Sequence, residues 1–110
     1  MSWEFVVEGP LLGHRCSVMA AFDKRFTMWK KLVRIIATEA RVPLDLDPKE
    51  SYSVMVELFW KRTARVDGEN VQKAIQDACF PRDRRVVEGH YKSYEHHGFE
   101  FAKVYVKKVS

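Results

Sequence analysis

Residues 51–61 constrain the fold more than any other stretch, because their side chains alternate strictly along the chain. One set of alternate positions holds Tyr52, Val54, Val56, Leu58 and Trp60, and the other holds Ser53, Met55, Glu57 and Phe59. Successive side chains of a β-strand point to opposite faces, so a period of two predicts a strand with one buried side. The rest of the chain must supply an apolar layer that covers this side.

Two segments with helical periodicity predict that layer. Between residues 22 and 40, apolar residues recur at spacings of three and four, which places them on one side of a helix: Phe26, Trp29, Val33, Ile36 and Ala40. Lys30, Lys31 and Arg34 fall away from this stripe, and the two lysines predict a solvated face, with contact to a DNA backbone as the alternative. A second helix opens within residues 65–73 and ends at Phe80-Pro81, with Val71, Ala74, Ile75 and Ala78 on its apolar side.

Three further strands complete the predicted fold. Residues 3–8 form the first, which ends at Gly9-Pro10, and residues 86–94 and 99–106 form the last two. Gly98 lets the chain turn between these two, so we expect them to pair as a hairpin. The sequence thus predicts one α+β domain over residues 1–110, in which a small mixed sheet of about four strands is covered on one face by two helices.

Composition limits the classes of protein that fit. With 46% hydrophobic and 31% charged residues, the chain has the balance of a globular domain, which excludes disorder. No apolar run approaches the roughly 20 residues that span a membrane. Cys16 and Cys79 form no CxxC pair, which fits a reducing compartment. We therefore expect a soluble cytoplasmic protein, whose net charge of +4 permits a nucleic-acid partner.

Acidic residues gather where the central strand gives way to the second helix. Asp67 and Glu69 lie there, and Asp83 can arrive from the loop that precedes the next strand. Because Mg²⁺ prefers hard oxygen ligands and keeps several waters, two or three such carboxylates suffice to hold it, and Mn²⁺ is the alternative ion. Lys73, one helical turn after Glu69, could stabilise the charge that develops on a phosphate under attack.

Basic residues surround these acids and favour a polyanionic partner. They are Lys61, Arg62, Arg65, Arg82, Arg84 and Arg85. Arginine presents a planar fork that suits phosphate oxygens, so this frame together with a cation would offset the repulsion between carboxylates and DNA. Structural interpretations stay open: Asp67 can cap the helix, Glu69 and Lys73 can form an ordinary i,i+4 pair, and the arginines can neutralise the acids in a surface network.

A family resemblance rests on the same residues. The run DGENVQK at residues 67–73, followed by Asp77 and by DRRVV at residues 83–87, resembles the RusA family of Holliday junction resolvases. The family pattern is D-x-D-N-x-x-K, a further aspartate four residues on, and then an acidic pair before β-branched residues. Glu69 stands where the family usually has aspartate, and Arg82 replaces the first member of the acidic pair. The order of helices and strands is also similar along most of the chain.

This resemblance implies a Mg²⁺-dependent homodimeric endonuclease of bacterial or phage origin. Such enzymes bind four-way junction DNA and nick two strands symmetrically during recombination and repair. Asp67, Glu69 and Asp83 would hold the metal, Lys73 would be the essential lysine, and Arg62 and Arg65 would bind DNA. The departures at Glu69 and Arg82 favour an alternative, which is a non-catalytic nucleic-acid-binding dimer derived from that fold. An unrelated α+β protein, in which the acids and arginines pair with each other, is a third interpretation.

Overall fold

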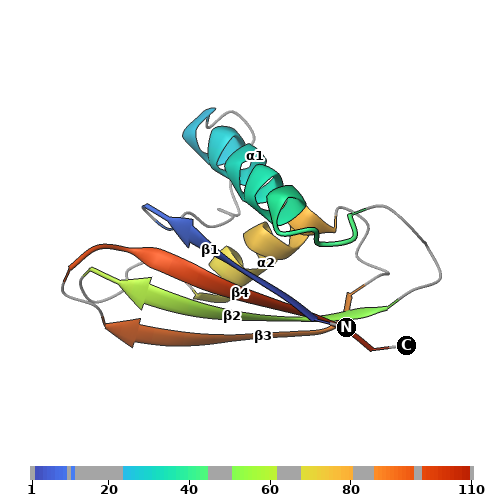
Figure 1. Cartoon of the computed structure of the whole chain (residues 1–110). Coiled ribbons are helices and arrows are strands. Elements are labelled where there is room, and N and C mark those ends of the chain that lie inside the picture. Colours follow the sequence, from blue (N-terminus) through green and yellow to red (C-terminus); the bar gives the residue numbers. More distant parts are fainter. Residues whose placement is uncertain are drawn as a thin grey trace.

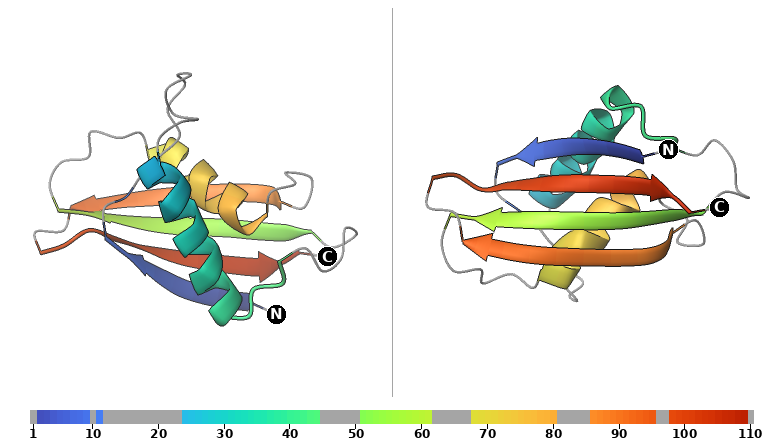
Figure 2. Two further views of the ribbon diagram at one scale, coloured as in Figure 1. Left: turned by 90° about the horizontal axis from the view of Figure 1, so that it is seen from above. Right: turned by 60° about the horizontal axis from the view of Figure 1, so that its bottom comes forward.

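A computed structural model describes residues 2–9, 11, 24–44, 51–61, 68–80, 86–95 and 98–109. Within these residues the strands form a single four-stranded mixed sheet, in the order β1-β4-β2-β3 (Figure 1). The elements in chain order are β1 (Ser2–Glu8), α1 (Lys24–Glu39), β2 (Tyr52–Trp60), α2 (Gly68–Cys79), β3 (Val86–Glu95) and β4 (Phe101–Lys108). The predicted α+β class is confirmed, with both helices on one face of the sheet (Figure 2).

The central strand β2 buries the side that its alternation predicts. Its five alternate residues Tyr52, Val54, Val56, Leu58 and Trp60 are at most 4% exposed, and the residues between them are half-buried. The strand lies between β4, which is antiparallel to it, and β3, which is parallel to it. Because both neighbours hydrogen-bond to β2, it is the strand from which the rest of the sheet takes its register.

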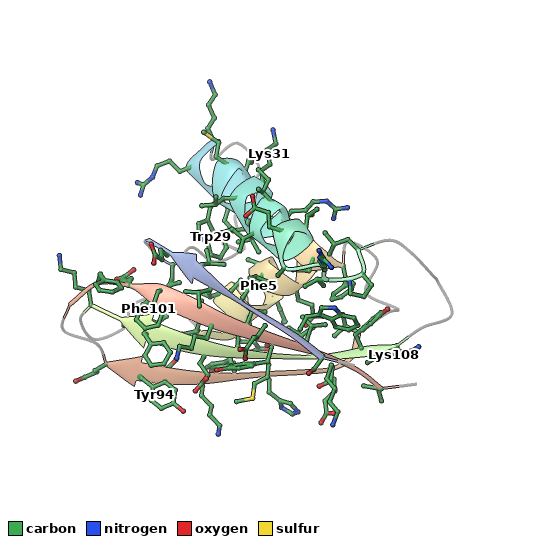
Figure 3. All side chains as sticks on the ribbon, in the orientation of Figure 1. Phe5, Trp29, Lys31, Tyr94, Phe101 and Lys108 are labelled. Atoms are coloured by element: carbon green, nitrogen blue, oxygen red, sulfur yellow. The ribbon has the colours of Figure 1, made fainter. Side chains whose placement is uncertain are left out.

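The two helices pack onto this buried side. Phe26, Trp29, Val33 and Ala37 of α1 are buried, and Figure 3 shows Trp29 on the side of α1 that faces the sheet while Lys31 points away. Val71, Ala74, Ile75 and Ala78 of α2 are buried as predicted, and Phe80 just beyond α2 stacks on Tyr52 with ring centroids 5.0 Å apart. A single apolar core therefore joins both helices to the sheet.

Arg34 links the two helices to each other. Its side chain is half-buried, and its Nη1 atom donates a hydrogen bond of 3.1 Å to the backbone carbonyl of Ala78. The last turn of α2 contains no basic residue of its own, so Arg34 supplies positive charge where the helix dipole is negative. The expectation that the lysines form a solvated face thus holds for Lys31, which is exposed, whereas Lys30 is half-buried.

Two glycines let α2 approach β3 closely. A Cβ atom built on Gly68 would lie 2.5 Å from Cε2 of Tyr91, and one built on Gly89 would overlap the side-chain amide of Gln72. Gln72 is the one buried polar residue among those described, and its Nε2 donates to Oε1 of Gln76 at 2.9 Å. The two glycines therefore leave room for these side chains between α2 and β3.

The predicted hairpin between the last two strands is wrong. β3 pairs only with β2 among the described strands, and β4 inserts between β2 and β1. The connection through α2 makes β2 and β3 a parallel pair, as a β-α-β unit requires. β3 and β4 therefore lie on opposite sides of β2 instead of side by side. Gly98 indicated that the chain reverses direction after β3, but a turn residue does not determine which strand the next strand pairs with.

Among the residues that the structure describes, no helix combines the length and the apolar character that crossing a membrane requires.

Candidate metal and nucleic-acid site

Glu69 and Lys73 lie together on the exposed side of α2. The Nζ atom of Lys73 is 3.2 Å from Oε1 of Glu69, and the two side chains are 57% and 56% exposed. Both lie in the N-terminal half of the helix, near the point where Gly68 touches β3. The ion pair that their spacing predicts is therefore present. It is exposed to solvent and lies near the N-terminal end of α2.

The remaining predicted site residues are described only in part. Lys61 follows directly after β2 and is exposed. The predicted metal ligands Asp67 and Asp83 lie outside the described residues, as do the predicted DNA-binding residues Arg62, Arg65, Arg82, Arg84 and Arg85. Within residues 2–9, 11, 24–44, 51–61, 68–80, 86–95 and 98–109, no group of three or more His, Cys, Asp and Glu residues could hold a metal ion.

The chemistry of the described residues suits a cation only in combination with further acids. The carboxylate of Glu69 offers hard oxygens that are open to solvent, which is the kind of ligand Mg²⁺ takes. The ammonium of Lys73 already neutralises that carboxylate, and the N-terminus of α2 carries partial positive charge. The same two groups favour a phosphate beside the carboxylate. A second acid is therefore needed to hold a cation here, and residue 67 is the nearest acidic position along the chain.

The length of α2 sets a condition on the third acid. This helix has 12 residues and is therefore about 18 Å long. Glu69 lies at its N-terminal end, whereas Phe80, three residues before Asp83, lies just past its C-terminal end. Val86, three residues after Asp83, pairs with Tyr52 at the beginning of β2. A cation shared by Glu69 and Asp83 thus requires residues 81–85 to run back along α2.

The uncovered face of the sheet carries a row of aromatic rings that sequence reasoning missed. Phe59 of β2 stacks on Tyr94 of β3 with centroids 5.1 Å apart, and on Phe101 of β4 with centroids 4.5 Å apart. Figure 3 shows Tyr94 on the side of the sheet away from the helices. The position of Phe59 on the polar side of β2 indicated an aromatic residue on this face. Its stacking partners depend on the register of β2 with β3 and β4, which the incorrect hairpin prediction did not give.

These rings are poorly arranged to stack on nucleic-acid bases. The ring planes of Tyr94 and Phe101 lie within 18° of the plane of Phe59. Because these two residues lie on the strands on either side of β2, they cover both faces of Phe59. A base needs an open ring face, which an aromatic side chain lying flat on a sheet would offer. Trp60 and Phe80 are 4% and 0% exposed and belong to the core, so neither presents a ring face to a base.

A hollow on the same uncovered face lies far from the acidic motif. It has a volume of about 290 Å³ and is lined by Glu4, Phe5, Val6, Lys103 and Tyr105 of β1 and β4. Helix α2 covers the opposite face of the sheet (Figure 2). The hollow therefore contributes nothing to a site at Glu69 and Lys73.

Comparison with known proteins does not assign the chain to a family. No protein-family model matches it, and no curated protein matches its sequence.

Proposed function

We propose that the protein is a Mg²⁺-dependent endonuclease of the RusA type, which resolves four-way DNA junctions by symmetric nicks. The observation that carries the proposal is the exposed Glu69–Lys73 pair at the beginning of α2, because it places a carboxylate and an ammonium side by side at the end of a helix that favours phosphate. The motif around the pair and the basic residues on either side of it support the same reading.

Each residue has a distinct role in this proposal. Asp67 and Glu69 hold Mg²⁺, or Mn²⁺ in its place, and Asp83 joins them if residues 81–85 run back along α2. When bound, the metal would polarise the phosphate and activate a water molecule as the nucleophile. Lys73 stabilises the added negative charge of the phosphate under attack. The six basic residues Lys61, Arg62, Arg65, Arg82, Arg84 and Arg85 bind the DNA backbone.

Cleavage of a synthetic four-way junction tests the proposal. The wild-type protein should nick the junction with Mg²⁺ and not with EDTA, and linear duplex and Y-shaped DNA should be cut far less. Asp67→Asn and Glu69→Gln should each abolish cutting and leave junction binding intact, because they remove ligand charge and keep side-chain size. Gln76→Glu is a matched control, since it changes the charge of α2 two turns further along. Cutting that persists in Asp67→Asn would refute the assigned roles.

The geometry of the Glu69–Lys73 pair also favours a second function. An exposed i,i+4 pair is an ordinary stabilising contact, worth a few tenths of a kcal/mol, and needs no catalytic role. A non-catalytic nucleic-acid-binding dimer would retain it. That protein would bind junction DNA with a steep salt dependence, and it would not cleave the DNA whichever metal ion is added. Binding that falls with salt and no nick with either Mg²⁺ or Mn²⁺ would select this function.

A further inference from the structure

Helix α1 carries a second apolar stripe that faces solvent. Met28, Leu32 and Ile35 are 69%, 43% and 56% exposed, although the buried residues of α1 already fill its inner side. Their spacings of four and three place them on one line along the helix. Large apolar side chains exposed singly are common, but three in line on one helix mark a contact surface.

The charges at the two ends of this stripe are arranged for an antiparallel partner. Arg25 precedes Leu32 by seven residues and Glu39 follows it by seven, so each lies about 10.5 Å from Leu32 along the axis. Two copies of α1 that cross antiparallel at Leu32 bring Arg25 of each copy to Glu39 of the other. A parallel pair would instead place arginine against arginine and glutamate against glutamate. The charges of Arg25 and Glu39 thus favour a second copy of α1 as the partner, in the antiparallel orientation.

We propose that α1 forms a two-fold interface with α1 of a second copy of this chain, the helices running antiparallel and crossing at Leu32. Met28 of each copy then packs against Ile35 of the other, and the axis passes between the two Leu32 side chains. The ends of the contact are closed by the Arg25–Glu39 pairs. Lys31 and its copy flank the centre, where both are exposed and screened by water.

The uncovered face of the sheet is a weaker candidate for this interface. Its aromatic rings already pack on one another, and several of its polar groups are paired within the chain. Tyr105 donates a hydrogen bond of 2.7 Å to Glu57, and His90 lies 2.7 Å from Glu88. The side chains of Met28 and Ile35 remain more exposed than Tyr94 on that face.

This interface deepens the proposed function and rests on it in one respect, which is that a two-fold DNA junction calls for a two-fold protein. The α1 pair lies on the helical side of the sheet, the side that also carries α2 with Glu69 and Lys73 (Figure 1). All contacts of the proposed interface come from α1. It can therefore be tested without DNA and without Mg²⁺.

Disulfide cross-linking tests the geometry of the pair. In a Cys16→Ser background, Leu32→Cys should form a covalent dimer within minutes under copper-phenanthroline oxidation, since the two-fold axis brings its two copies together. Met28→Cys should not cross-link to itself, because its copies lie about 12 Å apart along the antiparallel axis, beyond disulfide reach. An equimolar mixture of Met28→Cys and Ile35→Cys proteins should cross-link. Self-linking of Met28→Cys as fast as that of Leu32→Cys would overturn the antiparallel arrangement.

Sedimentation velocity tests whether the stripe holds the dimer. Leu32→Glu should weaken dimerisation by about 100-fold, because two copies of the charge enter the centre of the contact. Val6→Glu, an equally exposed valine on β1, is the matched control and should remain a dimer. Glu39→Arg should weaken the dimer and added Arg25→Glu should restore it. A wild-type monomer at 100 µM, or a dimer unaffected by Leu32→Glu, would overturn the inference. Junction cleavage measured separately shows whether the nuclease proposal fails with it.

Discussion

The contact between Gly68 and Tyr91 predicts a stability effect that one further substitution should cancel. A methyl group added by Gly68→Ala would lie 2.5 Å from Cε2 and 2.8 Å from Cδ2 of the Tyr91 ring, against an ordinary separation of about 3.5 Å. The ring must therefore move by about 1 Å. Because Tyr91 is 41% exposed, it can move outwards while α2 stays in place.

The expected free-energy change combines two opposing effects. Overpacking of this kind costs about 1–3 kcal/mol, while replacing glycine by alanine gains about 0.4–1 kcal/mol because the unfolded chain loses conformational freedom. An exposed ring yields more easily than a core ring, so we expect Gly68→Ala to lower the free energy of unfolding by about 1 kcal/mol, or about 4 °C in Tm. In a Tyr91→Ala background the methyl group meets no ring. There Gly68→Ala should instead stabilise the protein by about 0.5 kcal/mol.

Urea denaturation followed by tryptophan fluorescence can measure all four proteins of this cycle. Trp60 is a suitable reporter, because its Nε1 atom donates to Oγ of Ser93 on the same part of β3. The coupling between Gly68→Ala and Tyr91→Ala should be about 1.5 kcal/mol, outside the error for independent sites. If Gly68→Ala has the same effect with and without the Tyr91 ring, the argument that glycine is needed for this close approach is refuted.

Three further predictions concern hydrogen bonding and burial. Arg34→Ala should lower the free energy of unfolding by about 1–2 kcal/mol in urea, and Arg34→Lys by less, because the carbonyl of Ala78 loses its donor. Burial raises the pKa of Cys79 to about 12, so in Cys16→Ser the thiol should react with Ellman's reagent at pH 8 only as the protein unfolds. The hydrogen bond to Glu57 raises the pKa of Tyr105 to about 12. The folded protein then holds this proton more tightly than the unfolded chain, so the hydrogen bond contributes to stability below pH 10 and this contribution is lost towards pH 12. The urea midpoint of the wild-type protein should therefore fall between pH 9 and pH 11, and that of Tyr105→Phe should fall less.

Periodicity predicted the elements of this fold because it depends on burial alone. The alternation of β2 and the stripe of α1 each state which side is covered, and the structure covers those sides. Pairing is different, because β3 and β4 could each lie beside any strand whose apolar side matches theirs. The connection through α2 places β3 beside β2, and β4 takes the position between β1 and β2. Neither pairing can be predicted from residues 86–108 alone.

The same difference between local and long-range information limits what the sequence says about the site. Glu69 and Lys73 are four residues apart in one helix, so their contact follows from helical geometry alone. In the sequence, Asp67 precedes α2 and Asp83 follows it. The helix between them is about 18 Å long, and the pattern of acidic residues contains no measure of that length. A motif of acids thus predicts the local pair securely, whereas a shared cation depends on the path of residues 81–85. Mg²⁺ titration of Asp83→Asn beside Glu69→Gln separates the two cases: equal loss of metal affinity requires the chain to double back along α2, and loss in Glu69→Gln alone limits the metal to the N-terminal end of the helix.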